Sequence, residues 1–334
     1  MGERAGRRNA VITAVARYLP EKVLTNHELE RLVDTSDEWI RERTGIGERR
    51  ILEGHPTSHM AVAAANRVLE ARRLDPREVD LIIVATVTPD MPMPSTACLV
   101  QHRIGASRAW GYDLSAACSG FVYALVAGAQ FIESGAHRTV LVIGADKMSA
   151  ITDFTDRTTC VLFGDGAGAV LLEASDEPDL GLLDFEFHVD GSGADSLHVK
   201  AGGSLCPASH ETVDQRLHFL RQDGRAVFKF AVLKMVEVSA SLLRRNGLTV
   251  DDLKLFVPHQ ANLRIIEAAA QRLGLSSDRV MVNLERYANT TAATIPIALS
   301  EACEQGRLSR GDLALMVGVG SGYTWGSALF RWAG

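Results

Sequence analysis

The chain has 334 residues, of which 46% are apolar and 23% are charged, and this composition excludes a disordered, collagen-like or disulfide-stapled protein. Its formal net charge of −6 offers no overall basic surface, so we expect no nucleic-acid partner. The longest apolar strings, such as Leu81 to Val87, are far shorter than the ~20 residues of a membrane-spanning helix, so we expect no membrane partner.

In chain order, the apolar pattern predicts helices over 58–72, 121–133 and 226–245, and buried strands over 81–87, 140–143, 253–257 and 313–317. These strands are continuous apolar runs, which is typical of sheets covered by helices on both faces. The segment 180–224 is less periodic and rich in Gly, Asp, Ser and His, so we expect a surface excursion or lid there. The fold class predicted is α/β.

The second half of the chain repeats the first. Leu74 begins a segment that matches the one at Leu248, and Leu141 begins another that matches the one at Leu315. Both matches lie at the same offset, which is about half the length of the chain and is called the repeat offset below. We therefore expect two α/β halves related by a pseudo-twofold axis, residues 1–174 and 175–334. Chance resemblance between helix-strand units is the alternative, and the common order of the blocks argues against it.

The cysteines and the N-terminal segment both favour a cytoplasmic protein. The cysteines are Cys98, Cys118, Cys160, Cys206 and Cys303. They are odd in number and form no C-x-x-C pair, so we expect neither a structural zinc site nor a disulfide framework. The basic N-terminal residues lead into an apolar run that Arg17 interrupts, so they do not resemble a signal peptide.

Cys118 is a candidate nucleophile. It lies in Ser115-Ala-Ala-Cys-Ser-Gly120, just before the predicted helix 121–133. The positive end of a helix dipole favours a thiolate, so this position predicts a lowered pKa. The alternative is a small apolar cysteine packed against its alanine neighbours, and only a nearby base can decide between the two.

Two polar residues of the second half are candidate partners for Cys118. His259 ends a predicted strand, where open α/β sheets collect catalytic groups, although a hydrogen-bonded structural histidine is the alternative. Asn289 matches Ser115 at the repeat offset and opens another predicted helix, for which an N-cap is the simpler explanation. Together, Cys, His and Asn would supply a nucleophile and two hydrogen-bond donors for acyl transfer.

Two glycine clusters do not fit a nucleotide-binding loop. Phe163-Gly-Asp-Gly-Ala-Gly168 precedes a predicted strand rather than a helix, so we expect a tight turn between strands. Gly318-Val-Gly-Ser-Gly322 follows the last predicted strand of the second half. Its glycines allow backbone N–H groups to approach a small charged group, which predicts an oxyanion hole.

Six segments in order resemble the β-ketoacyl-acyl carrier protein synthase III family of thiolase-like condensing enzymes. They begin at Asp37 (DEWIRERTGI), Ala116 (AACSG), Thr155 (TDRTT, with FGDGAGA from Phe163), Val257 (VPHQANLRI), Asn289 (NTTAAT) and Thr324 (TWGSAL). The resemblance implies a duplicated five-layer αβαβα fold and a homodimer. It also implies an acyl-coenzyme A starter, condensation with malonyl-acyl carrier protein, and no metal or redox cofactor.

The resemblance also implies a role for individual residues. It assigns catalysis to Cys118, His259 and Asn289, the oxyanion hole to the backbone of Cys118 and Ser321, coenzyme A binding to Trp39, Arg43, Arg157 and Asn262, docking of the carrier protein to Lys229, Arg264 and Arg272, and the acyl pocket to Met93 and Val319. His259 and Asn289 would donate to the malonyl thioester carbonyl. Met93 would reach the pocket of the neighbouring subunit, where its flexible side chain predicts starters longer than acetyl.

Three residues depart from the family pattern, namely Ala288 and Ser321 at usual glycines and Val319 at a usual aromatic residue. The departures leave backbone donors in place but alter the expected shape of the pocket. Specialised relatives prime polyketides or transfer acyl groups to other acceptors, and this is one alternative function. A cysteine thioesterase is another, and an inactive scaffold subunit is a third, which the joint presence of the Cys, His and Asn disfavours.

Overall fold

In the computed structural model of the chain, residues 8–334 are described, and two large sheets form the frame. The first has the strand order β1-β7-β6-β4-β5. Its strands are β1 (Asn9–Tyr18), β4 (Leu81–Ala85), β5 (Trp110–Leu114), β6 (Thr139–Lys147) and β7 (Asp165–Ser175). β4 pairs in parallel with β5 and β6, whereas β7 is antiparallel to β1 and β6.

The second sheet has the strand order β11-β12-β13-β8. Its strands are β8 (Gly181–Val189), β11 (Leu255–Pro258), β12 (Leu313–Gly320) and β13 (Thr324–Arg331). β11 and β12 are parallel, and β13 is antiparallel to β12 and β8. β4 and β11 are buried along their whole length, as continuous apolar strands covered on both faces should be.

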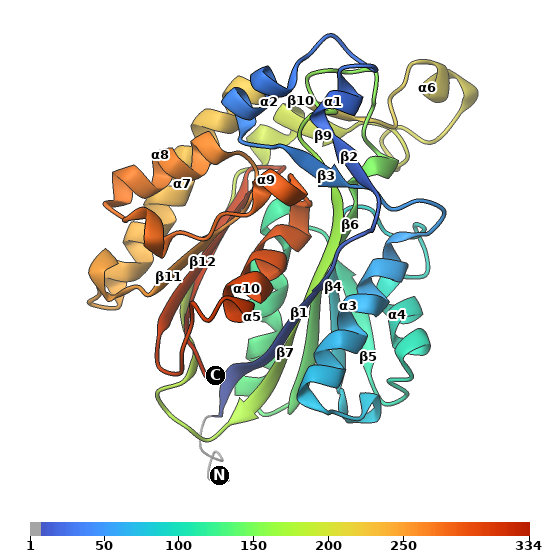
Figure 1. The fold of residues 1–334 in the computed structure, drawn as a ribbon. Helices are drawn as coiled ribbons and strands as arrows, with labels where there is room; N and C mark the ends of the chain where they lie inside the picture. Colours follow the sequence, from blue (N-terminus) through green and yellow to red (C-terminus); the bar gives the residue numbers. More distant parts are fainter. Residues whose placement is uncertain (1–7) are drawn as a thin grey trace.

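Helices cover both faces of both sheets and complete five layers (Figure 1). The large helices are α3 (Thr57–Arg72), α4 (Thr96–Ile104), α5 (Gly120–Glu133), α7 (Gly224–Arg245), α8 (Leu263–Leu273) and α10 (Thr294–Glu304). α5 and α10 share one apolar core with strands of both sheets and form the middle layer. α3 and α4 cover the outer face of the first sheet, and α7 and α8 cover that of the second. The predicted αβαβα architecture is confirmed.

The sequence repeat is visible as repeated structure. The 3-10 turns η1 (Pro76–Glu78) and η5 (Val250–Asp252) begin at positions related by the repeat offset, and so do β4 and β11, α5 and α10, and β6 and β12. The same offset relates the turn η2 (Ala117–Ser119) to η7 (Thr291–Ala293). The first sheet draws only on residues 9–175 and the second only on 181–331.

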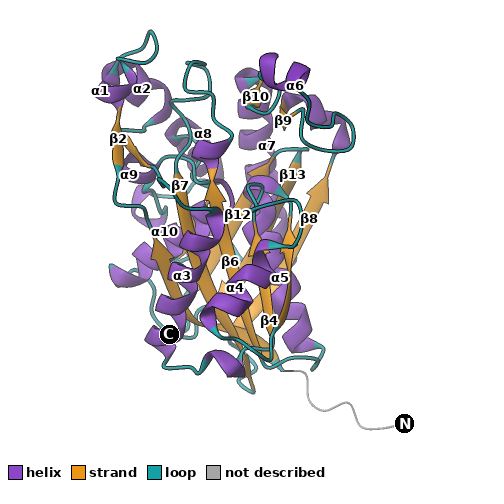
Figure 2. Ribbon diagram, turned by 90° about the vertical axis from the view of Figure 1, so that its right-hand side faces the viewer, coloured by secondary structure: helices purple, strands orange, loops and turns teal. Residues whose placement is uncertain are grey.

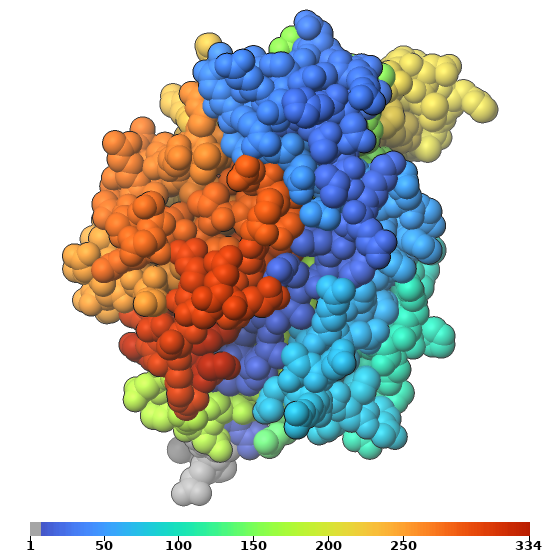
Figure 3. Space-filling model, viewed as in Figure 1, coloured from blue at the N-terminus to red at the C-terminus, as the bar shows by residue number. Residues whose placement is uncertain are grey.

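Shorter elements gather at one end of the molecule, above the strands (Figure 2). They are α1 (Asn26–Leu29), α2 (Asp37–Thr44), α6 (His210–Asp214), α9 (Leu284–Tyr287), β2 (Val23–Thr25), β3 (Glu48–Arg50), β9 (Leu197–Val199) and β10 (Leu220–Gln222). The region around α6 protrudes from the body in the space-filling view (Figure 3). Within residues 8–334, no helix is long and apolar enough to cross a membrane.

Two local predictions are wrong. The segment 180–224 is not wholly a surface excursion, because residues 181–189 form β8 at the edge of the second sheet. The glycine cluster after Phe163 is not a turn between strands, because β7 already begins at Asp165. Its glycines let α10 lie against the strand: a Cβ at Gly168 would stand 2.7 Å from Cβ of Pro296.

Candidate active site

Cys118 lies in the turn η2, between the end of β5 and the start of α5. Ala117 has a left-handed backbone (φ 47°), which reverses the chain between the strand and the helix. Ser119 Oγ donates to the carbonyl oxygen of Thr324 at 3.0 Å and fastens the turn to β13. Cys118 itself is only 6% exposed, so its sulfur faces an enclosed space rather than bulk water.

The predicted lowering of the pKa of Cys118 is wrong. Burial raises the pKa of this thiol to about 12, and the charge of Asp146 adds to the rise, while its own backbone N–H lowers it. The helix terminus offers fixed dipoles, but burial removes the water that would solvate a thiolate, and the loss of solvation dominates. The resting cysteine is therefore a neutral thiol that needs a base.

His259 follows β11, and its backbone N–H donates to the carbonyl oxygen of Val317 at 2.8 Å. Burial lowers its pKa to about 3, so the imidazole is neutral. Its Nδ1 lies 2.6 Å from Oγ1 of Thr294, and that hydroxyl in turn donates to the carbonyl oxygen of Thr291 at 3.1 Å. The hydroxyl has one proton, so the neutral ring has two forms. When that proton goes to Thr291, Nδ1 donates to the hydroxyl and Nε2 is able to act as a base; when it goes to Nδ1, the ring proton lies on Nε2.

Asn289 lies on a parallel bridge with Phe163, and the alternative explanation as an N-cap does not hold, because the turn η7 begins at Thr291 and its cap is Thr290. Its side-chain Oδ1 accepts from the backbone N–H of Thr291 at 2.9 Å. That bond uses the acceptor of the amide and leaves Nδ2 as a donor. The residue is 6% exposed, so this donor stands in a space that is largely closed to water.

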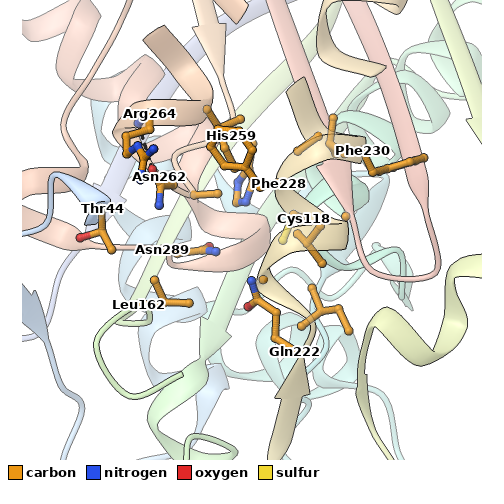
Figure 4. A pocket seen from close by; sticks show the side chains of 18 of the residues that line it. Thr44, Cys118, Leu162, Gln222, Phe228, Phe230, His259, Asn262, Arg264 and Asn289 are labelled. Carbon is orange, nitrogen blue, oxygen red and sulfur yellow. Dashed lines mark hydrogen bonds between the residues drawn. The ribbon is translucent and has the colours of Figure 1, made fainter. Parts of the chain in front are cut away.

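These three residues line one cavity of about 600 Å³. Figure 4 shows the sulfur of Cys118, the imidazole of His259 and the amide of Asn289 turned toward the same space. They come from the ends of β5 and β11 and from the segment before η7, so the duplicated fold brings a thiol from the first half to a base and a donor from the second. The arrangement provides a nucleophile, a proton acceptor and a hydrogen-bond donor.

Ser321 lies on the turn between β12 and β13 and lines the same cavity. Its hydroxyl donates to the carbonyl oxygen of Leu197, so the departure from glycine adds a bond between this turn and β9. Gly320 precedes it, and a Cβ there would stand 2.8 Å from the backbone nitrogen of Cys118. The close approach of the two turns therefore requires a glycine at 320, as the predicted oxyanion hole does.

The residues assigned to coenzyme A gather at the mouth of the cavity. Trp39, Arg43 and Asn262 line it, and the guanidinium of Arg157 lies 4.9 Å from the ring centre of Trp39. Asn262 also has a structural role: its Oδ1 accepts from the N–H of Arg264 and caps α8, while its Nδ2 donates to the carbonyl oxygen of Arg43.

Only one of the residues assigned to carrier-protein docking lines the cavity. Arg264 lines its mouth, and its guanidinium lies 5.8 Å from the ring centre of Phe228. Lys229 is exposed on α7, and Arg272 is exposed in the last turn of α8. The rise of an α-helix puts Arg272 about 12 Å along α8 from Arg264, away from the mouth.

The two residues assigned to the acyl pocket have different surroundings. Val319 lines the main cavity, whereas Met93 is 80% exposed and lines neither cavity beside Cys118. A second cavity of about 310 Å³ also opens on Cys118. Its lining is mainly apolar and includes Val87, Met148 and Ile151, so a hydrocarbon chain fits its chemistry.

Sequence reasoning missed several residues of the site. Thr291 and Thr294 hold the donor and the base, and Arg225 adds a cation at the mouth. Both threonines stood within the NTTAAT segment, but only the distances link them to His259. Within residues 8–334, no group of three or more His, Cys, Asp or Glu side chains is arranged to hold a metal ion.

The five-layer fold and the Cys-His-Asn cavity are those of a thiolase-like condensing enzyme, an acyltransferase, and the comparisons with known proteins agree. A family model described as 3-oxoacyl-[acyl-carrier-protein (ACP)] synthase III matches residues 112–191, and the model of its C-terminal region matches residues 243–332. The beta-ketoacyl-[acyl-carrier-protein] synthase III of Solibacter usitatus is 58% identical over 97% of this chain and 99% of its own length. The chain therefore belongs to the β-ketoacyl-acyl carrier protein synthase III family.

Solved structures show the same likeness. The 3-oxoacyl-[acyl-carrier-protein] synthase III of Aquifex aeolicus superposes with a TM-score of 0.90 at 46% identity, covering 97% of this chain and all of the other. The priming beta-ketosynthase of the R1128 polyketide pathway superposes with a TM-score of 0.91 at 37% identity, covering 100% of this chain and 99% of the other. The higher identities to synthases III favour that assignment over the polyketide alternative.

Proposed function

We propose that the chain condenses an acyl-coenzyme A starter with malonyl-acyl carrier protein, releases carbon dioxide and coenzyme A, and forms a 3-oxoacyl-acyl carrier protein that initiates fatty-acid synthesis. The observation that carries the proposal is the meeting of Cys118, His259 and Asn289 in one buried cavity. No metal or redox group takes part in the chemistry proposed, because each step needs only a nucleophile, a base and hydrogen-bond donors.

In the first half-reaction, Cys118 takes the acyl group. Nε2 of His259 accepts the thiol proton as the sulfur attacks the thioester carbonyl, since the high pKa of Cys118 keeps the thiol protonated until then. The backbone N–H groups of Cys118 and Ser321 stabilise the oxyanion. The carbon–sulfur bond of the donor breaks, the leaving coenzyme A thiolate takes the proton from the imidazolium, and acyl-Cys118 remains beside a neutral imidazole.

In the second half-reaction, malonyl-acyl carrier protein enters the cavity. With the Thr294 hydroxyl turned to donate to Nδ1, the neutral ring carries its proton on Nε2. This N–H and Nδ2 of Asn289 donate to the malonyl thioester carbonyl and stabilise the enolate that forms as carbon dioxide leaves. The carbanion attacks the acyl carbonyl, the bond to sulfur breaks, and the Cys118 thiolate takes a proton from solvent. The two tautomers of the neutral ring reconcile the predicted donor role of His259 with its action as a base in the first half-reaction.

The mouth of the cavity suits both substrates. Trp39 and Arg157 offer an aromatic face and a guanidinium for the adenine and phosphates of coenzyme A, with Arg43 and Asn262 beside them. Lys229, Arg264 and Arg272 offer positive charge to an acidic carrier protein, with Arg264 at the entrance. The apolar cavity beside Cys118 would receive the starter chain.

We further propose a cytoplasmic homodimer. β5 is an edge strand of the first sheet, and the side chains of Trp110 on it and of Met91 and Met93 nearby are 42% to 80% exposed, as a face that pairs with a second copy would be in the separated chain. Met93 would then reach the acyl cavity of the partner, as predicted. All cysteines of the described chain are free thiols, which agrees with a reducing compartment.

Mass spectrometry of the intact protein tests the proposed function. Incubation with mixed acyl-coenzyme A donors should add one acyl group at Cys118, and addition of malonyl-acyl carrier protein should remove it as a 3-oxoacyl product. Cys118→Ala should abolish both, whereas Cys160→Ala, which removes another buried thiol, should retain them. Steady release of coenzyme A without malonyl-acyl carrier protein would identify a thioesterase instead.

The chain-length preference can be read in the same assay. Each further methylene buried in the acyl cavity is worth about 0.8 kcal/mol, or roughly fourfold in kcat/KM, until the cavity is full. Wild type should therefore prefer donors longer than acetyl, and Met93→Phe should shorten the preferred chain. An unchanged preference in Met93→Phe would exclude Met93 from the pocket.

A further inference from the structure

Asp146 is a fully buried carboxylate beside the site that the proposed reaction does not use. It lies near the end of β6 and is 0% exposed. Its Oδ1 accepts from Oγ1 of Thr86 (3.0 Å), N of Val87 (2.8 Å) and both N (3.2 Å) and Oγ1 (3.0 Å) of Thr88. Its Oδ2 accepts from N of Ala292 at 3.0 Å. All these partners are uncharged donors, so the site is built for a carboxylate without a counter-ion.

The bond to Ala292 reaches the turn that holds both partners of Cys118. Thr291, the preceding residue, donates its N–H to Asn289 and accepts from Thr294, the residue that is hydrogen-bonded to Nδ1 of His259. Thr291 has a left-handed backbone (φ 53°), which costs free energy for a β-branched residue and must be held by its surroundings. From the other half, the side chain of Asp146 anchors the turn at Ala292, while backbone bonds to Leu162 and Gly164 hold the preceding Asn289.

The pseudo-twofold repeat explains why a carboxylate stands there. At the repeat offset, Ala292 matches Cys118 and Gly320 matches Asp146. In the first turn, Gly320 brings no side chain to the N–H of Cys118, which is the donor proposed for the oxyanion. In the second turn, the matching N–H of Ala292 binds Asp146. A carboxylate thus fills the duplicate of the oxyanion position, and it is charged at pH 8 because burial raises its pKa only to about 6.

We propose, on the basis of the condensing function above, that Asp146 is a positioning residue that holds Asn289 and His259 in the geometry required for decarboxylation. Its charge also opposes thiolate formation at Cys118, although burial is the larger cause of the raised pKa there. The two effects on the reaction are opposite: the hydrogen bonds of Asp146 favour decarboxylation, and its charge disfavours the thiolate. Loss of the charge should impair the decarboxylating groups and at the same time make the thiol more reactive.

The test compares Asp146→Asn with Asp165→Asn. Asp165 is a second fully buried carboxylate, which accepts from Leu52 and Ser149 and has no bond to the turn at Ala292. Carbon dioxide release from malonyl-acyl carrier protein should fall by about tenfold to a hundredfold in Asp146→Asn, the effect of displacing a catalytic group by a fraction of an ångström to an ångström. Alkylation of Cys118 by iodoacetamide at pH 8 should become several-fold faster. In Asp165→Asn the ratio of the two rates should stay at the wild-type value.

A decrease of both rates by the same factor in Asp146→Asn, or an equal change of the ratio in Asp165→Asn, would overturn the inference. Thr86→Val provides a milder variant, because it removes one donor to Asp146 and retains the charge; it should slow decarboxylation without faster alkylation. Should Asp146→Asn fail to fold, this variant decides the positioning role by itself. A wild type that releases no carbon dioxide would refute the proposed function, whereas an active wild type with unaffected variants refutes only the role of Asp146.

Discussion

The turn that bears Cys118 and the turn that follows Asn289 are copies of one structure with different chemistry. Each begins with a left-handed residue, Ala117 in η2 and Thr291 in η7, and each leads into a helix of the middle layer. A glycine of the adjacent strand lies under each turn: a Cβ at Gly144 would stand 2.3 Å from the carbonyl oxygen of Ala292, and one at Gly318 would stand 3.1 Å from that of Cys118. The backbone of each turn is therefore constrained in the same way, by close contact with a glycine of the adjacent strand.

The side chains divide the reaction between the two copies. At the repeat offset, the counterpart of Cys118 is Ala292, that of His259 is Ala85, and that of Asn289 is Ser115. The first copy presents the nucleophile and the second presents the base and the donor. The comparison shows that duplication supplies two matching strand-to-helix turns, and that replacement of a few side chains turns them into one asymmetric site.

The largest predicted effect separates the two partners of Cys118. His259→Ala should slow both half-reactions, because Nε2 accepts the thiol proton before it serves as a donor. Asn289→Ala should leave acylation of Cys118 nearly unchanged and reduce decarboxylation by about two to three orders of magnitude, the loss expected for one preorganised donor. Rapid-quench assays of acyl-enzyme formation and carbon dioxide release measure the two steps.

Ser115→Ala is the matched control for Asn289, because it changes the exposed counterpart in the first copy. Both rates should stay within about threefold of wild type. Full acylation in His259→Ala would show that the thiol needs no imidazole base and would return His259 to the purely donor role expected from the sequence.

The pH dependence of alkylation tests the state of the first turn. Below the pKa of about 12, the thiolate fraction of Cys118 rises about tenfold per pH unit, so alkylation by iodoacetamide should be about a hundredfold faster at pH 9 than at pH 7. The rise should show no plateau in this range. A plateau near pH 7 would mean that the helix terminus prevails over burial, as the sequence had predicted.

The elements predicted from the sequence are the strands buried on both faces and the helices with one buried apolar face. The predicted helix 226–245 corresponds to α7, because helically spaced apolar residues mark a buried helix face, and the predicted strand 313–317 lies within β12, because a continuous apolar run marks a strand covered on both faces. β8 was missed because its Leu182-Leu-Asp-Phe-Glu-Phe187 stretch mixes charged and apolar residues, as an edge strand does. The bond from Ala292 to Asp146 joins the two halves of the chain, so no local pattern announces it.

The difference between the two halves extends to the mouth of the cavity, where α8 of the second half carries Arg264. Arg264→Glu should raise the KM for malonyl-acyl carrier protein about five- to tenfold at low salt, because a surface charge acts on a charged partner. Acylation by acyl-coenzyme A should be less affected. The effect on KM should shrink at physiological ionic strength, where surface charges are screened over about 8 Å. Arg272→Glu makes the same charge change farther along α8 and should raise the KM less. Equal effects of the two variants would place docking along the whole helix rather than at the mouth.

The smallest predicted effect concerns Ala288, which precedes Asn289 and stands where the family usually has glycine. Its backbone (φ 56°, ψ −159°) lies in a region that glycine adopts freely, and an alanine there costs about 1–3 kcal/mol. Its methyl group is buried, so removing it forfeits about 0.8 kcal/mol, and glycine loses about 0.5–1 kcal/mol more backbone entropy on folding. Ala288→Gly should therefore change the free energy of unfolding by between about −1 and about +2 kcal/mol, as urea denaturation would measure. A loss of more than about 1 kcal/mol would show that packing of the methyl group outweighs the strain, and that the second turn has adapted to alanine.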